Sequence, residues 1–320
     1  MKRFYRLTPH FRLSNNPLFA LEARRVRRGE SSKSLIDYSL LLIVVVCVLG
    51  FLLWLFLALS SRGSRQSATM SDYFLSLFVL SLAAAFALDC VAMTSSIGSI
   101  NGEITSRRWD LLRLTAMESK QIVAAKYGVA QVRAWRTMVL IVALRITVVL
   151  MGGLTIALGI FSDPGRYFSL DLPPLVAAFL LINAAGCAGF YIVEPFWRMR
   201  TVTAIGLAVS ARVGHIVSSV VFGVGALAIF WLAQGFVALA LLLIVGIIIV
   251  PLASVEVLLA QVVICSPILF LAAVGVTIYG FYSVVYTWGM RRALRFAARL
   301  DLNERRALVT QTQVLSTLVL

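Results

Sequence analysis

Long apolar runs separated by shorter polar stretches dominate the chain from residue 35 onward. A helix needs about 20 mostly apolar residues to cross the hydrocarbon core of a bilayer, which is roughly 30 Å thick. On this measure the pattern predicts six transmembrane helices, at about 35–59, 73–93, 137–161, 173–193, 213–232 and 266–288.

The region between the fifth and sixth predicted spans is also apolar, but Pro251, Glu256 and Pro267 interrupt it. If two further segments crossed here, the basic segment after residue 288 would lie outside, whereas Lys and Arg collect on the cytoplasmic side. We therefore predict that residues 236–262 form a re-entrant hairpin that enters from outside. Non-helical backbone at membrane depth is tolerated where protein buries it.

Both ends of the chain carry basic amphipathic segments. In the cytoplasmic lead 1–34, Asn16 is placed to cap a helix that starts at Pro17 and ends near Gly29, with apolar residues on one side and arginines on the other. The tail 289–320 begins in the same way. The fold class that we expect is an all-α polytopic membrane protein: six transmembrane helices, a re-entrant hairpin before the last, and amphipathic interfacial helices at both ends.

Composition supports one membrane domain, at 35–288. Of the 320 residues, 60% are hydrophobic and 13% are charged, whereas soluble domains have about 45–50% apolar and 25% charged residues. The net charge is +15, and 25 of the 29 Lys and Arg residues lie in 1–34, 107–136, 198–212 and 291–306. This distribution indicates cytoplasmic termini and cytoplasmic segments at 94–136 and 194–212, so topology explains the charge without nucleic acid as a partner.

The most polar long stretch between the first and last spans is 101–126, in the predicted cytoplasmic loop 94–136. Thr115 followed by Glu118 fits a capping box, which predicts a new helix from Ala116. Before it, Trp109 and Leu112 give a short amphipathic piece. Such a piece suits the membrane surface or a groove of a partner protein, and a solvated linker is the alternative.

The order of residues in this loop resembles the first cytoplasmic loop of type-2 (export-type) ABC transporter permeases. The resemblance rests on Glu103, Trp109-Asp110-Leu111-Leu112, Leu114-Thr115, Gln121-Ile122-Val123 and Lys126. Asn16-Pro17-Leu18 with Glu22-Ala23-Arg24, and the run from Glu194 to Arg212, are also similar to that family. The loop departs from the family pattern at Arg107-Arg108, where Gly-Thr is usual, and at Ala116, where Pro is usual.

The resemblance implies a permease subunit of an ATP-driven exporter in the cell (inner) membrane. It implies a coupling helix at about 103–115 that docks into an ABC ATPase subunit, with Glu103, Trp109, Asp110, Leu111, Leu112 and Leu114 as the docking residues. It also implies a second permease chain, as a homodimer or heterodimer. ATP and Mg²⁺ would be bound by the ATPase chains.

The sequence carries no motif for chemistry of its own. It has no G-x-x-x-x-G-K-[ST] phosphate loop, no HExxH and no paired acid motif. The four cysteines lie singly in apolar runs, which gives no disulfide framework and no metal-ligand pattern. We therefore expect a chain that is not an enzyme and holds no cofactor.

Isolated polar residues in the apolar runs are candidates for a polar pathway, namely Arg145, Asn183 and Glu256. Arg145 has three interpretations: it snorkels to the headgroups, pairs with an acid such as Asp89, or lines a cavity. Two other functions stay open, a non-transport membrane anchor or assembly subunit of a larger complex, and an ion-coupled secondary transporter.

Overall fold

The structure is a computed structural model that describes residues 13, 16–27, 32–60, 65–106, 117–162, 174–213, 215–244 and 271–299. These residues are almost entirely helical and include no strand, which confirms the all-helical class. The helices are α3 (Pro17–Arg27), α4 (Ser32–Ser60), α5 (Arg65–Thr105), α7 (Ser119–Ser162), α9 (Pro174–Arg212), α10 (Ile216–Ile244) and a last helix, Leu271–Arg299, here called the C-terminal helix.

Five of the described helices contain segments long and apolar enough to cross a membrane: Tyr38–Leu57, Asp72–Thr105, Ser119–Leu154, Val217–Leu241 and Leu271–Arg299. The chain is therefore a multi-pass membrane protein. Helix α9, which contains the fourth predicted span, is not among the five. Six spans remain a prediction.

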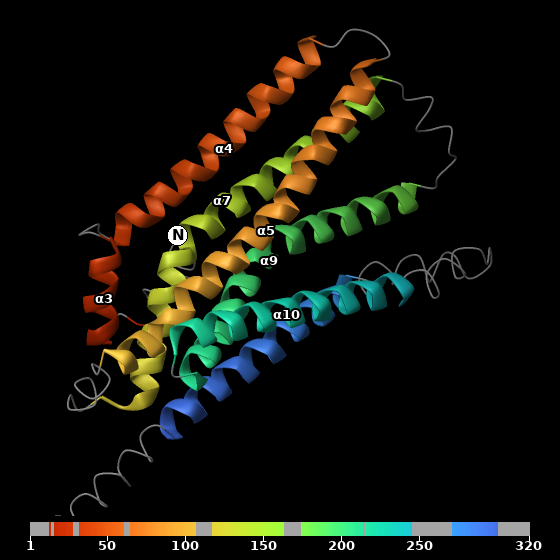
Figure 1. The fold of residues 1–320 in the computed structure, drawn as a ribbon. Helices are drawn as coiled ribbons and strands as arrows, with labels where there is room; N and C mark the ends of the chain where they lie inside the picture. The colour runs from red at the N-terminus through yellow and green to blue at the C-terminus, as the bar shows by residue number, and fades with distance from the viewer. Residues whose placement is uncertain are drawn as a thin grey trace, which may run out of the picture.

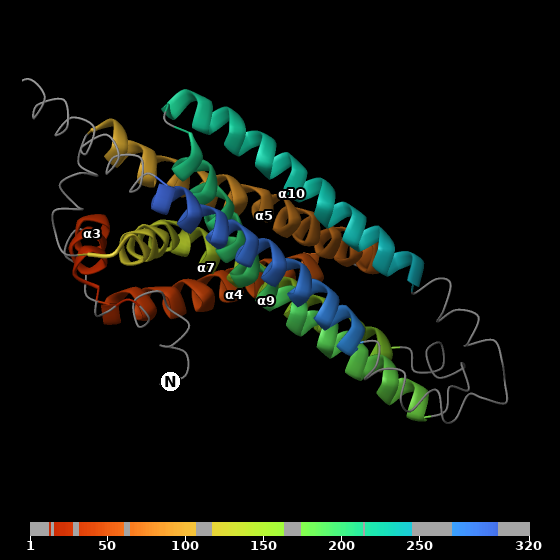
Figure 2. The ribbon, with the colours of Figure 1, turned by 90° about the horizontal axis from the view of Figure 1, so that it is seen from below.

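The helices form one elongated bundle (Figure 1). Helix α4 lies at one edge against α7, the centre is made by α5, α7 and α9, and α10 lies with the C-terminal helix on the other side. Helix α3 lies across one end of the bundle, beside the start of α7 (Figures 1 and 2). The end of α5 and the end of α9 lie at this same end of the bundle.

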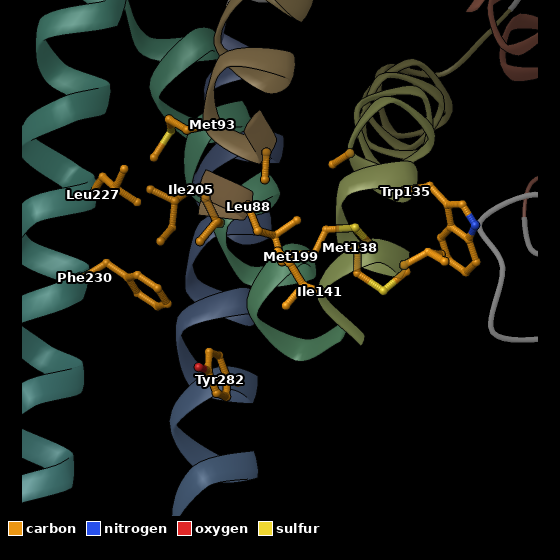
Figure 3. Close-up of a cluster of buried hydrophobic side chains, with 14 of the residues drawn as sticks. Leu88, Met93, Trp135, Met138, Ile141, Met199, Ile205, Leu227, Phe230 and Tyr282 are labelled. Atoms are coloured by element: carbon orange, nitrogen blue, oxygen red, sulfur yellow. The ribbon is translucent and has the colours of Figure 1, made fainter. Parts of the chain in front are cut away.

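The main core lies where several helices meet (Figure 3). It is a methionine-rich cluster of buried apolar side chains drawn from α5, α7, α9, α10 and the C-terminal helix, including Leu88, Met93, Met138, Ile141, Met199, Ile205, Leu227, Phe230 and Tyr282. The outer helices instead present apolar side chains outward, as at Leu41 on α4 and Val221 on α10. That surface suits contact with lipid.

Small residues bring the C-terminal helix close to α9. Gly289, Ala293 and Ala297 are spaced by four residues and are buried. A Cβ on Gly289 would lie only 3.1 Å from the backbone carbonyl carbon of Ala204. Stripes of small residues of this kind let membrane helices pack backbone to backbone.

The start of α3 agrees with the sequence prediction. The Oδ1 atom of Asn16 accepts hydrogen bonds from the backbone N–H groups of Leu18 and Phe19, at 3.1 and 3.2 Å. The helix starts at Pro17 as expected and ends at Arg27. Gly29, the predicted end, lies outside the described residues.

The predicted loop 94–136 is largely helical. Helix α5 continues to Thr105 and α7 begins at Ser119, so the two spans extend well into the region expected to be a loop. The predicted new helix exists, but it begins at Ser119, three residues after the predicted start at Ala116. The carbonyl oxygen of Glu118 accepts the first hydrogen bonds of α7. These come from the backbone N–H groups of Gln121 and Ile122, at 2.8 and 3.2 Å.

The predicted cytoplasmic segment 194–212 is not a separate element. Helix α9 continues through Glu194 and Pro195 to Arg212, and residues 201–208 are all buried. The C-terminal helix likewise unites the end of the sixth predicted span with the start of the basic tail.

The fifth predicted span is longer than expected. Helix α10 extends to Ile244, past the predicted end near residue 232. Residues 236–244 of the predicted re-entrant region therefore continue that helix. The remainder of this region, with Glu256, lies outside the described residues.

Candidate functional site

Two clusters of charged side chains are buried in the bundle, and the first is a pair formed by Asp89 and Arg198. Asp89 lies on α5 and is fully buried. Its carboxylate accepts hydrogen bonds from Nε of Arg198 at 2.8 Å and from Nη2 at 2.6 Å. This bidentate contact of a guanidinium with a carboxylate is the strongest arrangement such a pair can adopt.

Glu194 extends this pair to a second arginine. Its Oε1 lies 3.3 Å from Nη1 of Arg198, one turn away on α9, and its Oε2 lies 2.7 Å from Nη1 of Arg145 on α7. Arg145 also donates from Nη1 to the carbonyl oxygen of Tyr191 at 2.5 Å. Two acids and two arginines thus form a charge-balanced set, which offsets part of the cost of burying ions.

Neighbouring helices supply further donors. Nε1 of Trp231 on α10 donates to Oδ2 of Asp89 at 2.8 Å. The hydroxyl of Tyr282, on the C-terminal helix, bonds Glu194 and accepts from Nε2 of Gln234 at 2.6 Å. We call Asp89, Arg145, Glu194, Arg198, Trp231, Gln234 and Tyr282 the buried charge network.

Aromatic rings cover the two guanidinium groups. The Cζ atom of Arg145 lies 4.6 Å from the ring centroid of Tyr191, and that of Arg198 lies 5.7 Å from the ring centroid of Phe86. Both distances are within the range of cation–π attraction. The network therefore connects α5, α7, α9, α10 and the C-terminal helix through fixed polar contacts in a low-dielectric environment.

The second cluster joins α3 to the C-terminal end of α5 and to the first turns of α7. Nζ of Lys126 on α7 lies 2.5 Å from Oε1 of Glu22 on α3 and 2.7 Å from Oε1 of Glu103 on α5. The Lys126 side chain is only 4% exposed. We call Glu22, Glu103 and Lys126 the α3 junction.

Two further contacts hold α3 in place. Nδ2 of Asn16 donates to the carbonyl oxygen of Gln121 at 2.8 Å. Phe19 and Ala23 are buried on the apolar side of α3 against Val129 of α7. The predicted interfacial helix is therefore attached to the first turns of α7 by polar and apolar contacts together.

The structure places the predicted site residues in different parts of the molecule. Glu103 belongs to the α3 junction, Arg145 belongs to the buried charge network, and Asn183 is half-buried on α9. The other predicted site residues lie outside the described residues, namely Trp109, Asp110, Leu111, Leu112, Leu114 and Glu256. The connection that carries the predicted docking residues leaves α5 just after the α3 junction.

Arg145 pairs with an acid, but the acid is Glu194. The partner suggested from the sequence, Asp89, binds Arg198 instead. The sequence prediction missed Glu194, Arg198 and Tyr282 as members of this site. The sequence did contain a signal for two of these residues. Glu194 and Arg198 are four residues apart, a spacing that places them on the same face of a helix.

Neither cluster is arranged as a metal centre. Among the described residues, no group of three or more His, Cys, Asp or Glu side chains is placed to hold a metal ion. The contacts of both clusters hold helices together. Comparison of the chain with family models, with curated proteins and with solved structures gives no match.

Proposed function

We propose that the chain is the membrane-spanning permease subunit of an ATP-driven ABC exporter. In this proposal a separate ATPase subunit docks on the connection between α5 and α7, and its movement drives substrate across the membrane. The proposal starts from the resemblance of residues 103–126 to the coupling loop of such permeases. ATP and Mg²⁺ belong to the ATPase subunit, and a second permease chain completes the transporter.

The α3 junction is the observation that carries the proposal. Glu103, the first of the predicted docking residues, lies on α5, and Lys126 lies on α7. These two helices flank the connection that carries the other docking residues, and the ion pair joins them to each other. Glu22 adds α3 to the same group. A force applied to the loop by an ATPase would therefore act on α5, α7 and α3 together.

The buried charge network supplies a path from this end of the bundle to the other helices. It bonds Asp89 of α5 to side chains of α9 and α10, and Arg145 of α7 to Glu194 of α9. Glu194 in turn accepts a hydrogen bond from Tyr282 of the C-terminal helix. A two-state transporter needs contacts that differ between its states, and hydrogen-bonded ion pairs between helices are suited to exchange in this way. In the proposal, movement of α5 and α7 changes the partners within this network.

Site-specific photo-cross-linking tests the docking surface. A photoreactive amino acid at position 109, in the full chain expressed in its native membrane, is expected to capture a P-loop ATPase. The same amino acid at Trp288, an exposed tryptophan of the C-terminal helix, is the matched control.

Capture of the ATPase from position 109 and not from position 288 supports the proposal. Capture of a different membrane protein at 109, with no ATPase, favours the alternative in which the chain is an anchor or assembly subunit of a larger complex.

A further inference from the structure

A polar cavity of about 380 Å³ lies where α3 meets α5 and α7. It is lined by three basic side chains, two acidic ones, two serines and a few small apolar residues: Arg25, Lys126, Arg133, Glu22, Glu103, Ser95, Ser99, Val26, Gly98, Val129 and Ala130. Its volume is far larger than a single bound water molecule needs. The cavity can therefore hold a polar group of several atoms.

The charges of the lining fall into two sets. Lys126 contacts both Glu22 and Glu103, so its charge is matched and these three groups together carry a net charge of −1. Arg25 and Arg133 bring the lining as a whole to a net charge of +1. Arg25 and Arg133 are exposed, and neither guanidinium has an ion-pair partner within the described ranges. Two positive charges at the cavity are thus available to a ligand.

The guanidinium groups of Arg25 and Arg133 favour an oxyanion as the ligand of the cavity. A guanidinium presents N–H donors in a planar fork that matches phosphate oxygens. The serine hydroxyls already donate to helix carbonyls, Ser95 to Ala92 at 2.9 Å and Ser99 to Ser96 at 2.6 Å. The donors for a phosphate are therefore Arg25 and Arg133.

The location of the cavity points to a lipid as the source of the phosphate. Glu22, Arg25 and Val26 of α3 line the cavity, and α3 lies across one end of the bundle (Figure 2). This amphipathic helix exposes the apolar Leu21, as a helix in the headgroup region does. Val26 and Val129 add apolar surface to the lining. Basic pockets between spans on the cytoplasmic side suit anionic headgroups.

We propose that this cavity binds the headgroup of an anionic phospholipid, with Arg25 and Arg133 holding its phosphate. The bound lipid would link α3 to α7 beside the α3 junction. This inference does not depend on the transport proposal, because it concerns only the attachment of α3 to the bundle and to the membrane.

Native mass spectrometry of the full chain in detergent tests the site. The probes are phosphatidylglycerol, phosphatidylcholine as the neutral lipid, and free glycerol phosphate as the soluble source of the same phosphate chemistry. The variants are R25Q/R133Q and, as a control of equal charge, R24Q/R291Q. Arg24 and Arg291 are exposed and do not line the cavity. The single variants R25Q and R133Q each remove one of the two charges. A partial loss of lipid binding in these variants is then distinguished from a loss of folding in the double variant.

We expect phosphatidylglycerol to bind in preference to phosphatidylcholine. Its apparent affinity should fall about tenfold or more in R25Q/R133Q, less in each single variant, and little in R24Q/R291Q. An equal loss in the two double variants overturns the proposal, because it reduces the effect to overall charge. Displacement of phosphatidylglycerol by an equal concentration of glycerol phosphate overturns the lipid assignment in favour of a soluble phosphate compound.

Discussion

Arg198 holds the carboxylate of Asp89 through two of its nitrogens, Nε and Nη2, at 2.8 and 2.6 Å. Asp89 is fully buried on α5, and Arg198 lies far along the chain on α9. Each residue would be costly in an apolar environment without the other. The pair therefore fixes how two central helices of the bundle meet.

Replacing Asp89 with Asn tests this pair. D89N leaves Arg198 buried with only part of its charge matched, which we expect to cost about 3–5 kcal/mol. The measurement is thermal unfolding in detergent. D72N is the control, since Asp72 lies on the same helix and is exposed. In D89N/R198Q both charges are removed. The loss of stability in this double variant should be smaller than the sum of the losses in D89N and in R198Q. Equal melting temperatures of D89N and D72N would contradict the assignment.

The α3 junction gives a second prediction. K126M leaves Glu22 and Glu103 facing one another without their shared cation, so α3 should detach from the ends of α5 and α7. Limited trypsin digestion should then cut faster at Arg24 and Arg25. In the control K120M, an exposed lysine of the same helix is replaced. If K126M and K120M are cut at the same rate, the junction does not hold α3.

Asn16 makes two different contacts, which two substitutions separate. N16A removes the helix cap and the bond to Gln121, whereas N16D keeps a capping oxygen and loses only the donor to Gln121. A lost cap costs about 1 kcal/mol. We expect amide hydrogen exchange in α3 to be fastest in N16A, intermediate in N16D and slowest in the original chain. Equal rates of amide hydrogen exchange in N16A and in the original chain would contradict a capping role for Asn16.

Close packing of the C-terminal helix on α9 is tested at glycine. In G289L a side chain must enter the space beside the Ala204 backbone, which is 3.1 Å from the position of a Cβ. We expect a loss of about 1–3 kcal/mol. G280L is the matched control, because nothing lies within 4 Å of a Cβ at that position of the same helix. Stability that drops equally in the two variants would contradict close packing at Gly289 as the cause, since a change from Gly to Leu by itself favours a helix.

Features with local signals could be predicted from the sequence. The first span is a continuous apolar run, and the expected range 35–59 agrees with α4 (Ser32–Ser60). The cap at Asn16 depends only on residues up to three positions away. Both signals act within one helix, so no knowledge of the tertiary structure is needed.

Helix ends that depend on tertiary contacts could not be predicted in this way. Polar residues such as Glu103 and Lys126 resemble loop residues in the sequence, but in the structure they lie inside helices and pair across the α3 junction. The sequence predicts that the fourth span ends near residue 193, yet α9 continues through Pro195 to Arg212. Residues on both sides of this proline pack into the core cluster, for example Ile192 and Met199, and this packing offsets the cost of a proline within a helix.

The partner of Arg145 illustrates the same limit. The sequence offers both Asp89 and Glu194 as acids near the ends of predicted spans. The choice between them depends on how α7 and α9 are rotated relative to each other, which a single sequence does not encode in any short pattern. The docking residues from Trp109 to Leu114 rest on the family resemblance, since they lie outside the described residues.

Purification of the tagged full chain from its native membrane in mild detergent tests whether an ATPase subunit docks on the connection between α5 and α7. Quantitative mass spectrometry of the eluate measures which proteins accompany the chain and in what amount. We expect a P-loop ATPase in equal amount, lost in W109A/D110A and retained in the control W288A/D72A, in which an exposed tryptophan and an exposed aspartate are removed elsewhere. A chain that elutes alone, or with partners that include no ATPase, would contradict the account.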